Sequence, residues 1–300
     1  MAASPPHRLG QIIGDFLEEL IEPLLEDFCQ KHGQNSIESG LFLDKKGERS
    51  ARSGKKLTWE DKQGNSHDLD FVIERGGSND KIGCPVAFIE VAWRRYTKHS
   101  KNKVQEIQAA IMPIVEMYSS DPPFLGIFLA GFFTKPAIRQ LESLGFTVSF
   151  FPYRTFVEAF STVGINIESN DKTSDEHSSR IADKIKNLSL EARSQVKNRL
   201  ISLNREQLGP FFAALEKALI KGIVRLVLTP LYGEAREFKT PFELADFVTK
   251  YKSVETNLPF AKYEIYVQYT NGSEIRSNFQ EKGEILDFLE YISKSVAVPK

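Results

Sequence analysis

The sequence is poor in the residues that build disulfide frameworks, zinc sites and membrane spans. It has two cysteines, Cys29 and Cys84, and five histidines among 300 residues, and the cysteines form no CxxC motif. This scarcity argues against a structural zinc site or a disulfide scaffold and favours a reducing compartment. No apolar run reaches the roughly 18 residues of a membrane span, and the segment MAASPPHRLG lacks the apolar stretch of a signal peptide. We therefore expect a cytoplasmic protein without membrane association.

The chain also lacks an excess of charge of either sign. The formal net charge is −1, which argues against a uniformly basic protein that coats DNA, although local charge can still be asymmetric. Hydrophobic residues make up 41% and charged residues 26% of the chain, as in globular proteins, so extensive disorder is excluded. The length allows one large or two ordinary domains.

The first half of the chain alternates between helical and strand patterns. Apolar spacing predicts a helix over 9–28, loops with a ragged hairpin over 33–66, and then strands and helices in alternation. The later elements are strands at 68–74, 84–93, 124–133 and 146–151, and helices at 100–118 and 135–144. The order αβββαβαβ predicts a mixed α/β sheet with helices on both faces.

A polar segment separates this half from a second module. Residues 166–179 contain few apolar side chains and indicate a linker or long loop between a domain at 1–165 and a module at 180–300. After a helical region, the pattern of 223–248 recurs at 263–289, each time as a hairpin followed by a helix. We expect a helical α+β module with a duplicated hairpin–helix unit, used for DNA recognition or assembly.

Two carboxylates of the first half are candidate metal ligands. Glu90 interrupts a nearly continuous apolar strand, and Asp70 lies in the preceding strand. A buried carboxylate is costly unless it is paired or binds a cation. If the two strands are neighbours, Asp70 and Glu90 can converge and bind Mg²⁺, which supports phosphodiester hydrolysis. The alternative is a structural role, in which Glu90 pairs with Arg94 or Arg95.

The residues around these carboxylates resemble the PD-(D/E)xK nuclease superfamily. Leu69-Asp70-Phe-Val-Ile is similar to the first half of its motif, and Ile89-Glu90-Val91-Ala92 to the second. The resemblance covers roughly residues 9–155 and implies a restriction-endonuclease-like αβββαβ core. One departure is clear, because Ala92 stands where the family usually has lysine.

The segment that follows is similar to type II restriction endonucleases in which an acidic ligand has moved to the next helix. The resemblance implies that Glu106 joins Asp70 and Glu90 as a metal ligand. It also implies that a glutamate of the first helix can approach the metal, and spacing does not choose between Glu19 and Glu22. Lys98, Lys101 and Lys103 are the available substitutes for the missing lysine, and we favour Lys103 as the catalytic cation.

Cations are concentrated just after the Glu90 strand. Arg94, Arg95, Lys98 and Lys101 lie in a stretch without acids, and the resemblance adds Asn102. These residues predict a contact surface for the DNA backbone. The alternative is a solvated basic face, the commoner fate of lysine runs. A second basic region, within 180–205, is equally compatible with a DNA clamp and with the outer face of two helices.

These observations combine into one functional hypothesis with two rivals. We expect a Mg²⁺-dependent DNA endonuclease, with Mn²⁺ as a substitute metal, that cleaves double-stranded DNA as a homodimer. The first rival is a nuclease-fold protein that has lost catalysis and binds DNA as a regulatory subunit, which Ala92 favours. The second is a protein–protein adaptor that uses the duplicated hairpin–helix units as its contact surface.

Overall fold

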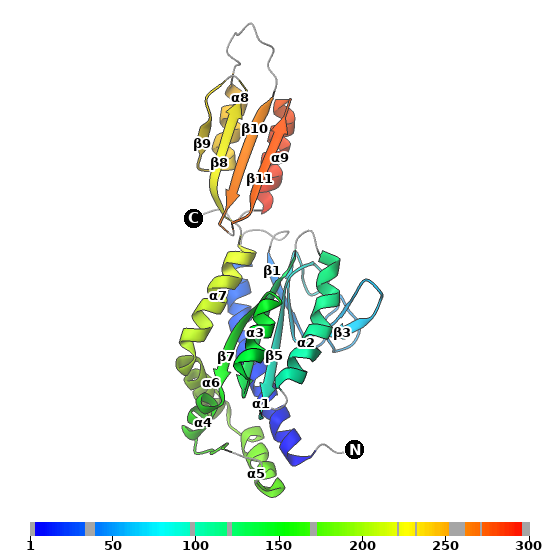
Figure 1. Cartoon of the computed structure of the whole chain (residues 1–300), viewed down its shortest axis with the longest axis vertical. Helices are drawn as coiled ribbons and strands as arrows, with labels where there is room; N and C mark the ends of the chain where they lie inside the picture. The colour runs from blue at the N-terminus through cyan, green and yellow to red at the C-terminus, as the bar shows by residue number, and fades with distance from the viewer. Residues whose placement is uncertain are drawn as a thin grey trace. The chain divides into compact units, whose positions relative to one another are not determined.

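The computed structural model describes residues 4–33, 40–96, 100–118, 122–168, 173–220, 222–231, 233–251, 262–270 and 272–295. The chain forms two compact units, the first from residues 1–34 and 40–215 and the second from residues 35–39 and 216–300 (Figure 1). Within the described residues, no helix combines the length and apolar character needed to cross a bilayer.

The first unit is built on a mixed five-stranded sheet of order β1-β4-β5-β6-β7. Its strands are β1 (Leu41–Lys45), β4 (Phe71–Arg75), β5 (Cys84–Arg94), β6 (Phe124–Gly131) and β7 (Phe146–Pro152). The pairs β1–β4 and β4–β5 are antiparallel, and β5–β6 and β6–β7 are parallel. A separate hairpin joins β2 (Thr58–Glu60) and β3 (Ser66–Asp68). The expected mixed α/β sheet is confirmed.

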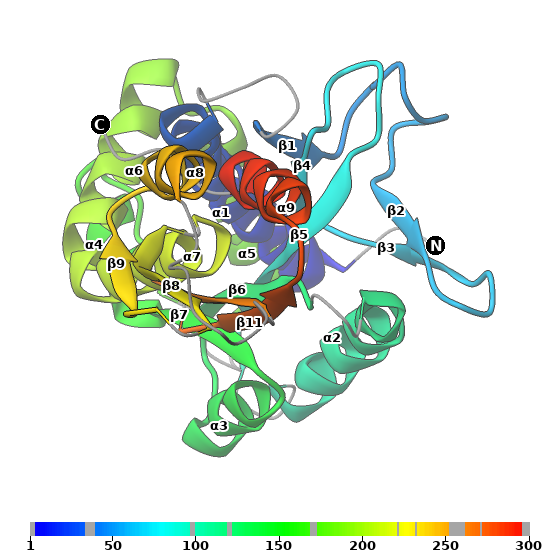
Figure 2. The ribbon, with the colours of Figure 1, turned by 90° about the horizontal axis from the view of Figure 1, so that it is seen from above.

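Helices cover both faces of this sheet (Figure 2). On one face lie α2 (Ser100–Val115), the short 3₁₀ helix Glu116–Tyr118 and α3 (Lys135–Ser143), whose apolar side chains pack on Phe88 and Ile127. The other face carries α1 (Pro5–Gly33), α4 (Tyr153–Ser161), α5 (Asp175–Lys186), α6 (Leu190–Leu203) and α7 (Arg205–Leu219). Aromatic contacts tie these helices to the strands: the ring of Trp93 lies 4.9 Å from that of Phe156 in α4.

Two boundaries differ from the sequence-based expectations. The region 180–215 belongs to the first unit rather than to the C-terminal module. The reason is burial: α5 and α6 place Ile185 and Leu200 in the interior, and Phe211 of α7 stacks 4.2 Å from Phe128 of β6. The strand expected at 68–74 is also divided, because β3 ends at Asp68 and β4 begins at Phe71.

The second unit contains a four-stranded antiparallel sheet of order β11-β10-β8-β9. Strands β8 (Ile223–Pro230) and β9 (Arg236–Phe238) precede α8 (Pro241–Lys250). Strands β10 (Tyr263–Tyr269) and β11 (Glu274–Phe279) precede α9 (Lys282–Ser295), so the order strand–strand–helix occurs twice. The two helices pack on one sheet face over a core that includes Leu226, Val267 and Leu289.

Candidate active site

Asp70 and Glu90 meet across the antiparallel pair β4–β5. Phe71 pairs with Ile89, so the residue before β4 lies opposite Glu90. The Asp70 backbone N–H donates to Glu90 Oε1 over 3.3 Å, and the Val91 N–H donates to Asp70 Oδ2 over 2.9 Å. These two bonds hold the carboxylates next to each other at the sheet interior, as the parity of the two strands predicts.

Glu90 is costly to ionise in this position. It is 8% exposed, and burial, reinforced by the Asp70 charge, raises the pKa of its carboxyl well above the ordinary value. The backbone hydrogen bond from Asp70 and the charges of Lys103 and Lys46 oppose this shift without cancelling it. Ionised Glu90 is therefore unfavourable in this position unless a further positive charge approaches it, and a bound cation would supply that charge.

A lysine that the sequence analysis did not single out lies closest to Asp70. Lys46 follows β1, and its Nζ lies 2.6 Å from Asp70 Oδ1 and 3.0 Å from Glu18 Oε2 of α1. Burial acts to lower the pKa of Lys46, but Asp70 and Glu18 together raise it above the ordinary value. Burial, and then the Asp70 charge, also raise the pKa of Glu18. Lys46 thus joins the first helix to the carboxylate pair.

The carboxylate of α1 that approaches the pair is not one of the two expected. Glu19 forms ion pairs with Arg193 and Lys197 of α6. Glu22 binds Lys45. Glu18 reaches the pair because helical spacing places it on a different side of α1 from its neighbour Glu19, a choice that depends on how α1 is rotated against the sheet.

Glu106 is not brought to the pair either. Its Oε2 lies 3.2 Å from Arg94 Nη2 and 3.4 Å from Lys103 Nζ, on the exposed side of α2. Within the described residues, no three His, Cys, Asp or Glu side chains are grouped so that they could hold a metal ion. The predicted three-carboxylate set is therefore incomplete. Asp70 and Glu90 remain, which still fits Mg²⁺, because this ion takes one or two carboxylates and fills its other positions with water and phosphate oxygens.

The predicted DNA-contacting residues divide into two groups. Arg94 ends β5, Arg95 follows it, and both line a cavity. Lys101 and Asn102 are exposed in the first turn of α2, while Lys98 lies outside the described residues. The basic region of 180–205 is largely engaged in ion pairs with acids of the first unit, of which Arg199 with Glu158 is one.

A cavity with a volume of about 500 Å³ is lined by Val91, the residue after Glu90, but neither Asp70 nor Glu90 lines it. Its walls are the N-terminal half of α1, the end of β5 from Val91 to Tyr96, and Lys103 of α2. Gly10 and Gly14 leave room for the Trp93 side chain, which lies within 4.0 Å of where a Cβ would stand on either residue. Glu18, which shares Lys46 with Asp70, also lines the cavity. Val91 and Glu18 therefore connect the cavity to the pair, the first through the chain and the second through Lys46.

A buried ion cluster supports the segment that carries Lys46. Arg49 Nη1 lies 2.7 Å from Glu74 Oε1 and 2.6 Å from Asp44 Oδ2, and the Glu74 side chain is fully buried. Arg52 adds a bond to the Lys45 carbonyl over 2.6 Å. The charges of β1 and β4 thus fix the position of the loop after β1.

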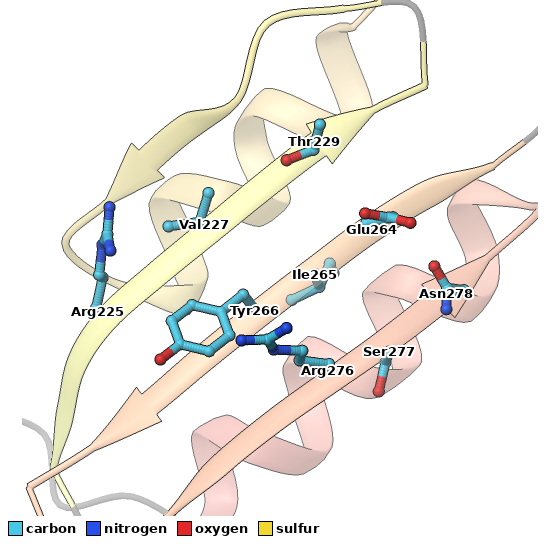
Figure 3. A pocket seen from close by; sticks show the side chains of 9 residues that line it. All are labelled: Arg225, Val227, Thr229, Glu264, Ile265, Tyr266, Arg276, Ser277 and Asn278. Atoms are coloured by element: carbon cyan, nitrogen blue, oxygen red, sulfur yellow. The ribbon is translucent and has the colours of Figure 1, made fainter. Parts of the chain in front are cut away.

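The second unit has its own hollow, on the sheet face that the helices leave uncovered (Figure 3). Arg276 extends over the Tyr266 ring, at 5.3 Å from its centroid. Arg225 pairs with Glu237 over 3.1 Å, and the Tyr266 hydroxyl donates to Glu274 over 2.7 Å. Arg225 and Tyr266 are thus paired with acids of the same unit, whereas the described contact of Arg276 is with an aromatic ring.

Comparisons with known proteins assign no family. No family model matches the sequence, and no curated protein matches it. Among solved structures, the crystal structure of a protein of unknown function, AF1548, is similar over 64% of this chain and 98% of that chain, at 13% identity and a TM-score of 0.29. A likeness of this size carries no argument about fold family or activity.

Proposed function

We propose that the chain is a Mg²⁺-dependent DNA endonuclease with a restriction-endonuclease-like first unit. The observation that carries the proposal is the Asp70–Glu90 pair, in which a backbone hydrogen bond holds the buried Glu90 carboxylate next to the half-buried Asp70. The order α1, β1–β4–β5, α2, β6 supports it, because this is the αβββαβ order that the motif resemblance implies. Mn²⁺ would serve as a substitute for Mg²⁺.

Each residue of the site has a separate role in the proposed reaction. Asp70 and Glu90 would hold the ion, which when bound supplies an activated water and neutralises charge on the phosphate. The Val91 N–H orients Asp70, and the Asp70 N–H orients Glu90. Lys103 of α2 lines the cavity, and its charge opposes the burial that raises the pKa of Glu90. Arg94 and Arg95 would bind phosphates of the substrate.

Lys46 supplies the positive charge that Ala92 lacks. Its ammonium group is bonded to Asp70, and its charge opposes the burial that raises the pKa of Glu90. An ammonium in this place can orient the attacking water and stabilise charge that develops on the phosphate. We therefore assign the role of the family lysine to Lys46, ahead of Lys103, which also pairs with Glu106.

The proposal is tested by cleavage of plasmid DNA in Mg²⁺, Mn²⁺ or EDTA. Asp70→Asn and Glu90→Gln keep the shape of each side chain and remove its charge, so both variants should lose cleavage while EDTA abolishes it in the wild type. Asp68→Asn is the matched control, because Asp68 is exposed, pairs with Lys56 and lies two positions from Asp70. Calorimetric titration with Mn²⁺ should show binding to the wild type and to Asp68→Asn only.

Cleavage at the wild-type rate by Asp70→Asn or Glu90→Gln would refute the proposal. Glu106→Gln tests whether Glu106 is a metal ligand. Loss of a metal ligand would abolish cleavage, whereas loss of an ion-pair partner of Arg94 would not. We expect this variant to retain cleavage. Two-strand cuts would imply a homodimer, since duplex symmetry is matched most simply by protein symmetry, and light scattering of the DNA complex measures it.

One observation favours a second candidate, a nuclease-fold protein that binds DNA without cutting it. Lys46 already places a positive charge against Asp70, and Ala92 removes the usual lysine. An ammonium can neutralise a buried carboxylate in place of a metal ion. This candidate predicts salt-sensitive DNA binding that is the same in Mg²⁺ and in EDTA, with no turnover in either.

A further inference from the structure

The end of β5 leaves several buried hydrogen-bond donors without acceptors. Among the described residues, Trp93 Nε1, Arg94 Nε, and Arg95 Nε and Nη1 are buried and have no hydrogen-bond partner. All four atoms are donors, and they come from three consecutive residues that line the cavity. Buried polar groups in native proteins are nearly always satisfied, so a cluster of donors alone indicates an acceptor that binds there.

Arg95 determines the charge of that acceptor. The residue is 9% exposed, and its side chain ends in a guanidinium group, which offers hydrogen-bond donors and no acceptor. Its described contact is with the Tyr96 ring, at 5.2 Å from the centroid, which supplies no negative charge. A buried cation without a counterion is strongly unfavourable, so the ligand must be an anion.

The cavity also contains two acids, which have a cation of their own. Asp15 and Glu18 line it, burial raises the pKa of both carboxyls, and the charge of Lys46, which pairs with Glu18, opposes both shifts. Lys103 shares Glu106 with Arg94, so two cations have one exposed acid between them. The donors at Trp93 and Arg95 therefore face a region in which no described acid pairs with them.

We propose that the part of the cavity lined by Trp93, Arg94 and Arg95, which we call the Arg95 pocket, binds the terminal phosphate of a nucleic-acid strand. The inference deepens the proposed function and rests on it for the choice of nucleic acid as the source. A terminal phosphomonoester carries up to two negative charges and is attached to the chain on one side, so it can enter a recess. An internal phosphodiester carries one charge and is flanked on both sides, so it stays at the surface. Guanidinium N–H groups bind phosphate oxygens as a fork.

The test measures binding in EDTA, where no cleavage occurs. Fluorescence anisotropy compares an internally labelled single-stranded DNA oligomer with a 5′-phosphate, with a 3′-phosphate, and with hydroxyl groups at both ends. The wild type should bind one phosphorylated form at least about tenfold more tightly than the hydroxyl form, and the tighter form identifies the end. Inorganic phosphate should remove this preference by competition.

Three variants connect the preference to Arg95. Arg95→Met keeps the length of the side chain without its charge, and Arg95→Lys keeps the charge without the fork. Both should lose the preference, so the lysine variant decides the matter if the methionine variant fails to fold. Arg139→Met is the matched control, since Arg139 is exposed on α3 away from the cavity, and it should keep the preference.

Equal affinity of the wild type for phosphorylated and hydroxyl oligomers would overturn the inference, as would a preference that survives both Arg95 variants. The outcome is separable from that of the nuclease proposal. Asp70→Asn should lose cleavage and keep the end preference. If the wild type shows the end preference but no cleavage in Mg²⁺ or Mn²⁺, the endonuclease proposal is refuted and phosphate binding in the Arg95 pocket is supported.

Discussion

At the scale of single residues, the site is dominated by charges that burial makes expensive. Glu90 is buried beside another carboxylate, which makes its ionised form unfavourable. The charge of Lys46, a residue in the loop after β1, opposes part of this effect. Such groups are the ones whose removal changes pH dependence and activity more than it changes packing. Predictions about them can therefore be tested with substitutions that preserve shape.

Glu90→Gln should remove a pH-dependent loss of stability. The pKa of Glu90 is raised in the folded state, so the native protein holds this proton more tightly than the unfolded chain. Its contribution is complete below the ordinary carboxyl pKa and is lost as pH rises toward the raised value, by about 1.4 kcal/mol for each unit of difference. Urea unfolding in EDTA over a pH series should show this decline in the wild type and its absence in Glu90→Gln. Glu106→Gln, which alters an exposed carboxylate, should follow the wild type.

Lys46→Gln should reduce DNA cleavage by about 100-fold, because it removes the only described cation bonded to Asp70. Lys45→Gln is the matched control, since the adjacent Lys45 pairs with Glu22 and Glu26 instead. We expect its rate to stay near that of the wild type in single-turnover assays. Equal losses in the two variants would mean that Lys46 acts through general charge and not through its contact with Asp70.

At the scale of secondary-structure elements, local pattern predicted most of the strands and helices. The apolar run of β5 and the repeated hairpin–helix pattern of the second unit were visible because burial imposes a period on the sequence. The meeting of Asp70 and Glu90 followed from strand parity once β4 and β5 were taken as neighbours. These inferences needed no knowledge of tertiary packing.

Other parts of the site carry no such pattern. Lys46 lies in a loop, where no periodicity marks a residue, and only the pairing of β1 with β4 brings it to Asp70. The selection of Glu18 over Glu19 and Glu22 depends on the rotation of α1. The C-terminal boundary of the first unit was also not predictable, because the apolar pattern of amphipathic helices such as α5 and α6 is the same whichever unit they pack against.

The Arg49 cluster gives a prediction at this scale. Arg49→Ala should destabilise the protein by about 3–5 kcal/mol, because it leaves the buried Glu74 carboxylate without its partner. Adding Glu74→Gln should recover part of this loss, since the uncompensated charge disappears. Urea titration of both variants measures the effect. A milder loss in Arg49→Ala than in the double variant would show that Glu74 does not depend on Arg49.

At the scale of the whole molecule, the two units have separate hydrophobic cores. The first unit buries apolar side chains on both faces of its sheet, under α2 and α3 on one and against α1, α4 and α7 on the other, and the second core lies between its sheet and α8 and α9. The Asp70–Glu90 pair and the Arg95 pocket belong entirely to the first unit. A defect in the second core should therefore leave the chemistry of the first in place.

Leu226→Ala provides the test. Leu226 is fully buried in β8, and its truncation should cost about 2–5 kcal/mol in the second unit. Scanning calorimetry should show one lowered transition beside an unchanged one. Mn²⁺ binding and cleavage of a short duplex should match the wild type. Loss of Mn²⁺ binding in this variant would show that the units depend on each other for folding.

The bridge from Glu18 through Lys46 to Asp70 also has a consequence for the time course of folding. Its three residues come from α1, the loop after β1 and the start of β4, so no local fragment contains the site. Contacts between distant segments form slowly, because the loops between them must close first. In a refolding experiment, metal binding should therefore appear after helical circular dichroism has recovered, and it would report the last tertiary step in the first unit.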